Sequence, residues 1–202
     1  MKTIVFDMYG VIIKDPHGGL MPYINRVFPG LDEQNVYSLW AAAASGEMPS
    51  PAFWRRIGDE NPAKTEREYL DGVEIDEMFV PAAETLRKNF RLALLSNDIS
   101  EWNRFLRGKF DLDRFFEAVV VSGDVGRRKP DPEIWKVLLE KLEAGADDCV
   151  FVDDRRSNLK PAAQMGMDVI LFNSRAVPYE GKTVSGFDEL LTLLTEKIKS
   201  RP

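Results

Sequence analysis

The stretch TIVFDMYGVI, residues 3–12, opens the chain with a short apolar run that holds one aspartate. Continuous apolar runs of about 4–8 residues are typical of strands buried on both faces of a parallel sheet, so Thr3–Met8 is predicted to be such a strand. In open parallel sheets, ligands bind beyond the carboxyl ends of the strands. The stretch therefore predicts a buried first strand that presents the carboxylate of Asp7 at the ligand-binding edge of its sheet.

Further apolar runs follow along the chain, and helical patterns separate them. The additional predicted strands are Arg91–Leu95, Ala118–Ser122, Cys149–Asp153 and Asp168–Phe172. The predicted helices are Pro81–Phe90, Ile99–Gly108, Asp131–Leu142, Arg156–Met165 and Phe187–Lys199. Strands that alternate with helices predict the α/β class, with a doubly wound, Rossmann-like parallel sheet as the core.

The segment between the first two predicted strands is far longer than a single crossover requires. It contains helical patterns separated by prolines and glycines, at Leu31–Ala44, Ser50–Ile57 and Thr65–Asp71. We expect residues 15–80 to form a small helical cap that stands over the carboxyl end of the sheet. Residues 1–14 and 81–202 are then expected to form the α/β core.

The composition argues against several classes of protein. Hydrophobic residues make up 44% and charged residues 30% of the 202 residues, a balance typical of globular chains and not of disordered ones. Lys and Arg total 27 against 33 Asp and Glu, and the resulting net charge of −6 argues against nucleic acid and membrane surfaces as partners. Cys149 is the single cysteine, so no intrachain disulfide can form and we expect a cytoplasmic protein. No feature of the sequence indicates an oligomeric state.

Polar side chains gather at the predicted strand ends. Together with Asp7, the residues that follow the strands are Ser96, Asn97, Asp98, Lys129, Asp153 and Asp154. Taken alone, each of them suits a turn or a helix cap. As a group they supply a carboxylate nucleophile, an oxygen site for a hard cation and donors for a phosphate dianion. These are the groups that phosphoryl transfer through an aspartyl phosphate requires.

Four segments of the chain carry a resemblance to a known family. VFDMYGVI, LLSND, RRKPDPEIW and FVDDRRSN resemble, in the same order, the four motifs of the haloacid dehalogenase-like hydrolase superfamily. The resemblance implies that Asp7 is the nucleophile and that Lys129 steadies the charge on the nucleophile and the phosphate. It also implies that Ser96 binds the transferring phosphoryl group, and we expect Asn97 beside it to contact the substrate. The predicted cap falls where the superfamily's helical cap is inserted.

The same resemblance implies a magnesium site. Its ligands would be the Asp7 carboxylate, the main-chain carbonyl of Tyr9 and Asp154, with Asp153 near the ion or bridged to it through water. Position 9 departs from the pattern, because most phosphatases of the superfamily carry there an aspartate that protonates the leaving group and later activates water. A tyrosine, with a pKa of about 10, can donate a proton at neutral pH but is a poor base.

Three functions are compatible with these residues. The first is a magnesium-dependent phosphatase that acts on a small phosphorylated metabolite, such as a sugar phosphate. The second is a 2-haloacid dehalogenase, whose first motif the Asp-x-Tyr-Gly pattern resembles and whose leaving halide needs no proton. Asp153 and Asp154 argue against it, because two carboxylates facing Asp7 without a cation would repel one another. The third is a phosphate-binding scaffold of impaired activity. We favour the phosphatase.

Overall fold

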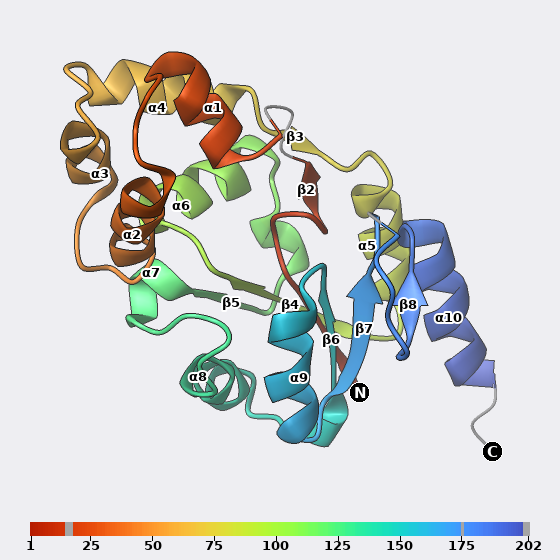
Figure 1. The fold of residues 1–202 in the computed structure, drawn as a ribbon. Helices are drawn as coiled ribbons and strands as arrows, with labels where there is room; N and C mark the ends of the chain where they lie inside the picture. The colour runs from red at the N-terminus through yellow and green to blue at the C-terminus, as the bar shows by residue number, and fades with distance from the viewer. Residues whose placement is uncertain (15–17, 175, 200–202) are drawn as a thin grey trace.

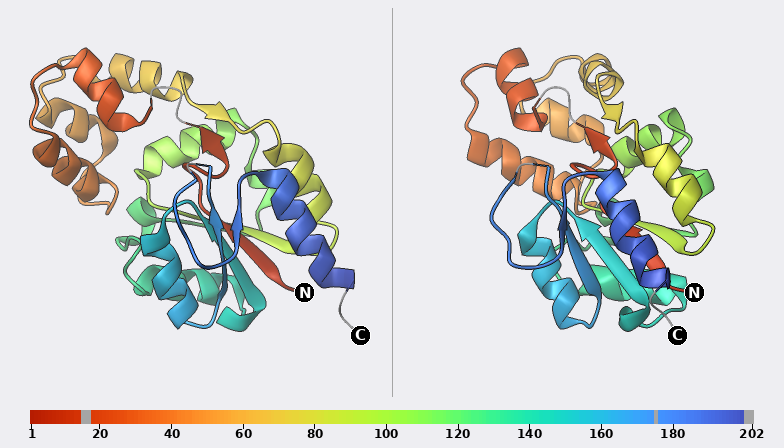
Figure 2. Two further views of the ribbon diagram at one scale, coloured as in Figure 1. Left: turned by 45° about the vertical axis from the view of Figure 1, so that its right-hand side comes forward. Right: turned by 90° about the vertical axis from the view of Figure 1, so that its right-hand side faces the viewer.

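The computed structural model describes residues 1–14, 18–174 and 176–199, with side chains up to residue 195. Its core is a six-stranded parallel sheet in the order β5-β4-β1-β6-β7-β8 (Figure 1). The strands are β1 Thr3–Phe6, β4 Arg91–Ser96, β5 Ala118–Val121, β6 Cys149–Asp153, β7 Asp168–Phe172 and β8 Thr183–Val184. Helices cover both faces of the sheet (Figure 2). The predicted α/β class with a doubly wound, Rossmann-like parallel sheet is therefore confirmed.

Strand β1 lies in the middle of the sheet, between β4 and β6. Its last residue, Phe6, pairs with Leu94 of β4 on one side and with Val152 of β6 on the other. The direction in which the chain adds strands reverses at β1, and such switch points form the ligand crevice of doubly wound sheets. The register therefore brings residues 7, 96–98 and 153–154 to the same edge of the sheet.

The side chains of each central strand alternate between two hydrophobic layers. Ile4 and Phe6 of β1 belong to one layer, whereas Val5 belongs to the other. The first layer is covered by α5 Phe79–Leu86, α6 Ser100–Lys109 and α10 Phe187–Lys199. The second is covered by α8 Glu133–Leu142 and α9 Arg156–Gln164. Because both faces are buried, the interior residues of the strands are apolar, and polar residues such as Arg91, Ser96 and Asp153 stand at the strand ends. This is the pattern that predicts the strands.

Helix α5 shows the largest difference from the predicted core elements. It runs from Phe79 to Leu86, whereas the sequence pattern predicts a start at Pro81 and an end at Phe90. The side chain of Asp76 accepts a hydrogen bond from the Met78 amide and begins the helix earlier. Pro81 then lies in the first turn, where the missing N–H of proline costs no intrahelical hydrogen bond.

Between β1 and β4 the chain forms a separate group of helices, α1 Leu20–Val27, α2 Glu33–Ala43, α3 Ser50–Arg56 and α4 Pro62–Asp71. The group lies to one side of the sheet, beyond the carboxyl ends of its central strands (Figures 1 and 2). The short strands β2 Ile13–Lys14 and β3 Glu74–Ile75 pair antiparallel where the chain enters and leaves it. The sequence analysis does not predict α1, because Pro22 interrupts its pattern. That proline lies in the first turn, where a helix tolerates it.

Hydrogen bonds from α6 of the core attach this helical group to the rest of the structure. Trp54 of α3 and Trp102 of α6 both donate their indole N–H to the same oxygen of Glu66 on α4, each at 2.9 Å. Lys109 of α6 donates to three main-chain carbonyls at the end of α4, at 2.7 to 3.1 Å. These contacts hold α3 and α4 against α6, which itself follows the end of β4.

The remaining described elements are short: α7 Ser122–Val125 and the 3₁₀ turns Asp113–Phe115 and Ala146–Asp148. A helix that spans a membrane needs about 20 apolar residues. Within the described part of the chain, no helix combines that length with sufficient apolarity.

Candidate active site

A cavity of about 580 Å³ joins the strand ends to the helical group. From the strand ends and the loops that follow them, it is lined by Asp7, Tyr9, Asn97, Asp98, Lys129 and Asp154. From the helices, it is lined by Leu20, Tyr37, Trp40, Tyr69 and Trp102. Most of the site residues predicted from the sequence therefore meet in one cavity, and Ser96 and Asp153 lie behind its wall.

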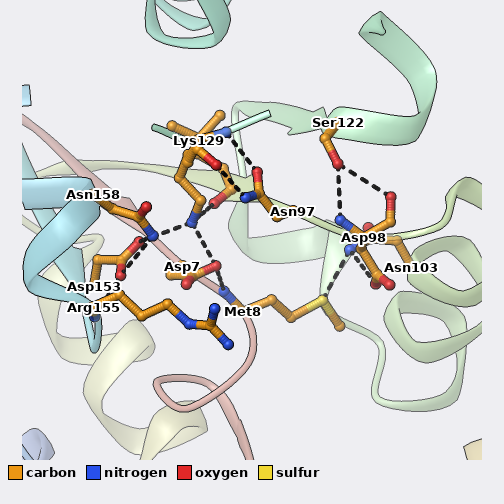
Figure 3. Close-up of polar contacts among 11 residues, drawn as sticks. Asp7, Met8, Asn97, Asp98, Asn103, Ser122, Lys129, Asp153, Arg155 and Asn158 are labelled. Carbon is orange, nitrogen blue, oxygen red and sulfur yellow. Dashed lines mark hydrogen bonds and ion pairs between the residues drawn. The ribbon is translucent and has the colours of Figure 1, made fainter. Parts of the chain in front are cut away.

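Asp7 follows β1 directly, and two donors hold one of its carboxylate oxygens. The Nζ of Lys129 lies 2.8 Å from Oδ1, and the N–H of Met8 donates to the same oxygen at 2.7 Å (Figure 3). Among the described residues, no donor contacts Oδ2 of Asp7. A carboxylate with one oxygen fixed and the other free, on the wall of a cavity, is oriented for nucleophilic attack.

Lys129 bridges Asp7 to the buried carboxylate of Asp153. Its Nζ lies 2.8 Å from Oδ2 of Asp153 and donates to the carbonyl of Leu95 at 3.0 Å. The side-chain amide of Asn97 fixes the main chain of the same lysine, with hydrogen bonds of 2.8 Å to its N–H and to its carbonyl. Burial lowers the pKa of Lys129, but the charges of Asp153 and Asp7 outweigh it, so that this pKa lies above its usual value. Lys129 therefore stays charged beside Asp7.

The Asp7 carboxyl group is buried next to like charges. Burial raises the pKa of Asp7 most, and the negative charge of Asp153 raises it next. Lys129 lowers this pKa and Asp154 raises it, so that it lies at about 8. A carboxyl group with this pKa is largely ionised at neutral pH when more positive charge is close to it. A bound divalent cation supplies such a charge and lowers the pKa of its neighbours.

The adjacent aspartates at the end of β6 have different surroundings. Asp153 is fully buried, and its oxygens accept from Lys129, from the N–H of Arg155 and from the side chain of Asn158 (Figure 3). Asp154 is half-buried and lines the cavity. Asp153 is thus occupied in holding Lys129, and Asp154 is the member of the pair that a ligand can reach.

Asp7, Asp153 and Asp154 each place a carboxylate oxygen within 4.8 Å of the other two. Gly10 leaves room for this cluster, because a Cβ at position 10 would lie 2.6 Å from Oδ2 of Asp154. The φ of Gly10 is +79°, a conformation that favours glycine. Carboxylate oxygens are the ligands that hard divalent cations prefer. The donor set and the space kept for it therefore fit a magnesium ion.

Ser96, the last residue of β4, carries a hydroxyl group that is fully buried. Its Oγ has no hydrogen-bond partner among the described residues. Buried polar atoms are nearly always hydrogen-bonded, so a hydroxyl without a partner at the end of a strand is a polar group that a ligand oxygen could satisfy if it passed the cavity wall. Its predicted contact with a phosphoryl group stays a prediction. The same holds for substrate binding by Asn97, whose amide here positions the Lys129 main chain.

Tyr9 and Asp98 complete the strand-end side of the cavity. Tyr9 is half-buried, packs against the hydrophobic core and brings no carboxylate close to the nucleophile. Asp98 is almost fully buried and accepts hydrogen bonds from the N–H of Ile99 and the amide of Asn103. Burial raises the pKa of Asp98 to about 8, although these two hydrogen bonds lower it. At neutral pH this carboxyl group is therefore largely protonated.

The sequence analysis missed several residues of the site. Asn158 stands five positions after Asp153 within FVDDRRSN, and a polar residue in the first turn of the helix after a strand is a signal that could have found it. Arg155 also lines the cavity, and in Figure 3 its side chain extends below Asp7. Trp40 carries no comparable signal, because a tryptophan at helical spacing is more often part of a hydrophobic core.

Comparisons with known proteins identify the family. The family model described as haloacid dehalogenase-like hydrolase matches residues 1–166. Bifunctional epoxide hydrolase 2 of Rattus norvegicus is 35% identical over 103 residues, which cover 49% of this chain and 19% of that protein. Flavin mononucleotide hydrolase 1 of Arabidopsis thaliana is 24% identical over 185 residues, which cover 86% of this chain and 73% of that protein. The match thus spans about a fifth of the length of the rat relative.

Solved structures share the fold. A haloacid dehalogenase-family enzyme from Bacteroides thetaiotaomicron, in complex with magnesium and inorganic phosphate, has a TM-score of 0.72 at 18% identity and covers 89% of this chain and 98% of that one. A 2-haloacid dehalogenase from Pseudomonas syringae has a TM-score of 0.71 at 18% identity and covers 98% of this chain and 99% of that one. Because the family model covers most of the chain, the protein belongs to the haloacid dehalogenase-like hydrolases and is a hydrolase.

Proposed function

We propose that the protein is a magnesium-dependent phosphatase that hydrolyses a small phosphorylated metabolite through an aspartyl phosphate on Asp7. The observation that carries this proposal is the pairing at Asp7, which lines the cavity: Oδ1 is held by Lys129 and Met8, and no described residue donates to Oδ2. The Arabidopsis relative, which matches over most of the chain, is named as a hydrolase of a phosphate ester. That name supports the reaction class.

In the first step of the proposed reaction, Oδ2 of Asp7 attacks the phosphorus of the ester. A bond forms between Oδ2 and phosphorus, and the bond between phosphorus and the ester oxygen breaks. The leaving oxygen departs with the electron pair and takes a proton from solvent. Lys129, 2.8 Å from the other oxygen of Asp7, orients the carboxylate and offsets negative charge during the transfer.

In the second step, a water molecule attacks the phosphorus and the bond to Oδ2 breaks. Asp7 regains its carboxylate, inorganic phosphate leaves, and the proton of the water passes to solvent. The buried hydroxyl of Ser96 and the amide of Asn97 are proposed to contact the phosphoryl group in both steps. Asp153 takes part as a positioning residue, because it fixes Lys129 from behind.

The magnesium ion would be held by Asp7, Asp154 and the main-chain carbonyl of Tyr9, with Asp153 behind them. When bound, the ion offsets the charge of the phosphate dianion and of the carboxylates that surround it. Two observations support this ion site: the cluster of three carboxylates, and the room that Gly10 leaves for Asp154.

We further propose that residues 15–80 act as a cap, and that residues 1–14 and 81–202 form the catalytic core. The described part of the proposed cap carries α1–α4, and it supplies Leu20, Tyr37, Trp40 and Tyr69 to the cavity wall. A wall of this kind excludes water from the phosphoryl group and contacts the leaving group. The cap is therefore expected to select the substrate.

The test is an assay of inorganic phosphate release from a panel of phosphorylated metabolites, sugar phosphates included, with magnesium and with chelator. A parallel assay measures chloride release from 2-haloacids. We expect phosphate release that depends on magnesium, and no chloride release. Chloride release without phosphate release would replace the phosphatase by the dehalogenase, which the Tyr9 position also allows. Neither reaction would indicate the impaired scaffold.

A further inference from the structure

The helical side of the cavity is walled by aromatic rings. Tyr37 and Trp40 lie on α2, with ring centres 5.6 Å apart, while Tyr69 of α4 and Trp102 of α6 lie 5.3 Å apart. Aromatic side chains gain energy from offset and edge-to-face contacts with other rings. Small-molecule pockets with such walls accommodate flat, largely apolar groups. The wall therefore favours a ligand with a planar ring.

Arg128 places a positive charge beside this wall. Its guanidinium carbon lies 5.2 Å from the ring centre of Trp40, and the residue lines the cavity. Its Nε is buried and has no hydrogen-bond partner among the described residues, and none of their carboxylates forms an ion pair with it. Leaving a buried charged donor unsatisfied is unfavourable. An anionic acceptor on a ligand would satisfy it.

Independently of the aromatic wall, Tyr9 limits which leaving groups can depart. No carboxylate stands two residues after the nucleophile to protonate the departing oxygen. General acid–base catalysis contributes about 10²–10⁴-fold to a rate, and a leaving group that is stable as an anion can depart without it. Phenolate-type oxygens meet this condition, whereas alkoxides do not. Leaving-group acidity and the aromatic wall thus point to the same chemical class.

We infer that the substrate is an aryl phosphate whose ring carries a second anionic group, such as a carboxylate. The inference rests on the proposed phosphatase function and adds a substrate class to it. The phosphoryl group reaches Asp7, the ring lies against the aromatic wall, and the second anion pairs with Arg128. In this arrangement Arg128 is a specificity-determining residue.

The probes are the ortho, meta and para isomers of carboxyphenyl phosphate, each compared with its carboxamide counterpart, together with phenyl phosphate. The amide keeps the size and shape of the carboxylate but removes its charge. The quantity measured with magnesium present is the ratio of kcat/KM between each acid and its amide. We expect wild-type protein to prefer at least one acid by about 10- to 100-fold, the range of a hydrogen bond to a charged group.

Arg128→Met is compared with Arg127→Met, its matched control. Arg127 is the preceding residue, is exposed and carries the same charge, but it does not line the cavity. The preference is expected to fall close to one in Arg128→Met, and to persist in Arg127→Met. Arg128→Gln serves as a second, smaller change, and its ratio is expected to fall in the same way. Intrinsic leaving-group differences between acid and amide cancel, because the same pair is compared in each protein.

A second readout needs no turnover. Binding of the hydroxybenzoate isomers and of the matching hydroxybenzamides is followed through tryptophan fluorescence, with Trp40 at the site as reporter. An acid preference that Arg128→Met and Arg128→Gln remove supports the inference. Hydrolysis of phenyl phosphate with no acid preference in either rate or binding overturns this inference alone, as does equal loss of preference in Arg127→Met. If none of these aryl esters is hydrolysed while another ester of the metabolite panel is, the inference fails and the proposed function stands. No phosphate release from the aryl esters or from the panel contradicts the proposed function, and the inference with it.

Discussion

The two sides of the cavity differ in how their polar groups are satisfied. On the strand-end side, Lys129 contacts two carboxylates and a carbonyl, and Asp153 accepts from three residues. On the helical side the wall is aromatic, and Arg128 has a buried N–H without a partner among the described residues. The first side is a preorganised polar network that suits the reaction, whereas the second leaves its contacts for a ligand. The difference between the two sides supports the proposal that the strand ends carry the chemistry and that the helices select the substrate.

The largest expected effect comes from removing the nucleophile on the strand-end side. Asp7→Asn should lower kcat for any phosphate ester by on the order of 10⁴-fold or more, because no other group forms the bond to phosphorus. The fold should persist, since an amide can keep the contacts with Met8 and Lys129. Steady-state kinetics and circular dichroism measure the two expectations. Asp124→Asn, an exposed change on α7, is the matched control. Near wild-type turnover by folded Asp7→Asn protein would show that Asp7 is not the nucleophile.

Tyr9 stands at the boundary of the two sides, and its substitution tests whether position 9 serves the reaction or the packing. Tyr9→Asp restores a carboxylate two residues after the nucleophile. It should raise kcat/KM for an alkyl phosphate more than for an aryl phosphate, by up to about 10²–10⁴-fold, because alkyl leaving groups need a proton. If Tyr9 serves instead to fill space in the core, the change loosens the packing and both substrates should lose rate together. Equal losses would make position 9 structural.

The burial of Asp98 in the strand-end network can be tested through the pH dependence of the free energy of unfolding. Its pKa of about 8 in the folded state lies above the usual value of 3.8, so the stability that its protonated form contributes is present at low pH and is lost as the pH rises from about 4 to about 8. Asp98→Asn mimics the protonated group, and should become more stable than wild type across that window, by on the order of a few kcal/mol. Chemical denaturation with chelator present, at a series of pH values, measures the difference. A difference that does not change with pH would contradict the buried, protonated assignment.

Magnesium should stabilise the strand-end side with a smaller effect. A ligand that binds only the folded state adds about 3 kcal/mol at a concentration 100 times its Kd. The Tm should therefore rise with magnesium in wild type. It should rise much less in Asp154→Asn, because Asp154 is the proposed ligand that lines the cavity. Ser96→Ala is the control, because Ser96 is proposed to contact the phosphoryl group and not the ion. An identical Tm with magnesium and with chelator would contradict the metal site and favour the dehalogenase.

The residues of the strand-end side could be predicted from the sequence, because the residues that follow parallel strands all lie at the same edge of the sheet. Asp7, Asn97 and Asp154 follow β1, β4 and β6, and adjacent parallel strands bring such residues to one edge. The division between Asp153, which holds Lys129, and Asp154, which lines the cavity, could not be predicted, since it depends on which way each side chain turns. His17, the single histidine, lies outside the described residues.

The helical side resisted prediction for a different reason. Trp40 lies on α2, and Arg128 lies in the loop between α7 and α8. Their contact depends on how α2 packs against that loop, and one sequence carries no signal for such a long-range contact. The sequence pattern does not predict helix α1, because prolines and glycines separate the helical patterns of this segment; Pro22 nevertheless lies in the first turn of α1, where a proline leaves all later hydrogen bonds intact. Local rules therefore predict elements and strand ends, whereas the wall that contacts a ligand needs the tertiary structure.

The proposed reaction requires Asp7 to carry the phosphoryl group during turnover. The most direct measurement mixes wild-type protein and magnesium with a radiolabelled aryl phosphate, quenches with acid within a single turnover, and maps the label by peptide mass spectrometry. We expect an acid-stable, base-labile label on the peptide that contains Asp7, and none in Asp7→Asn. Release of phosphate by the wild type with no label on that peptide, or with the label at another residue, would contradict the proposed reaction.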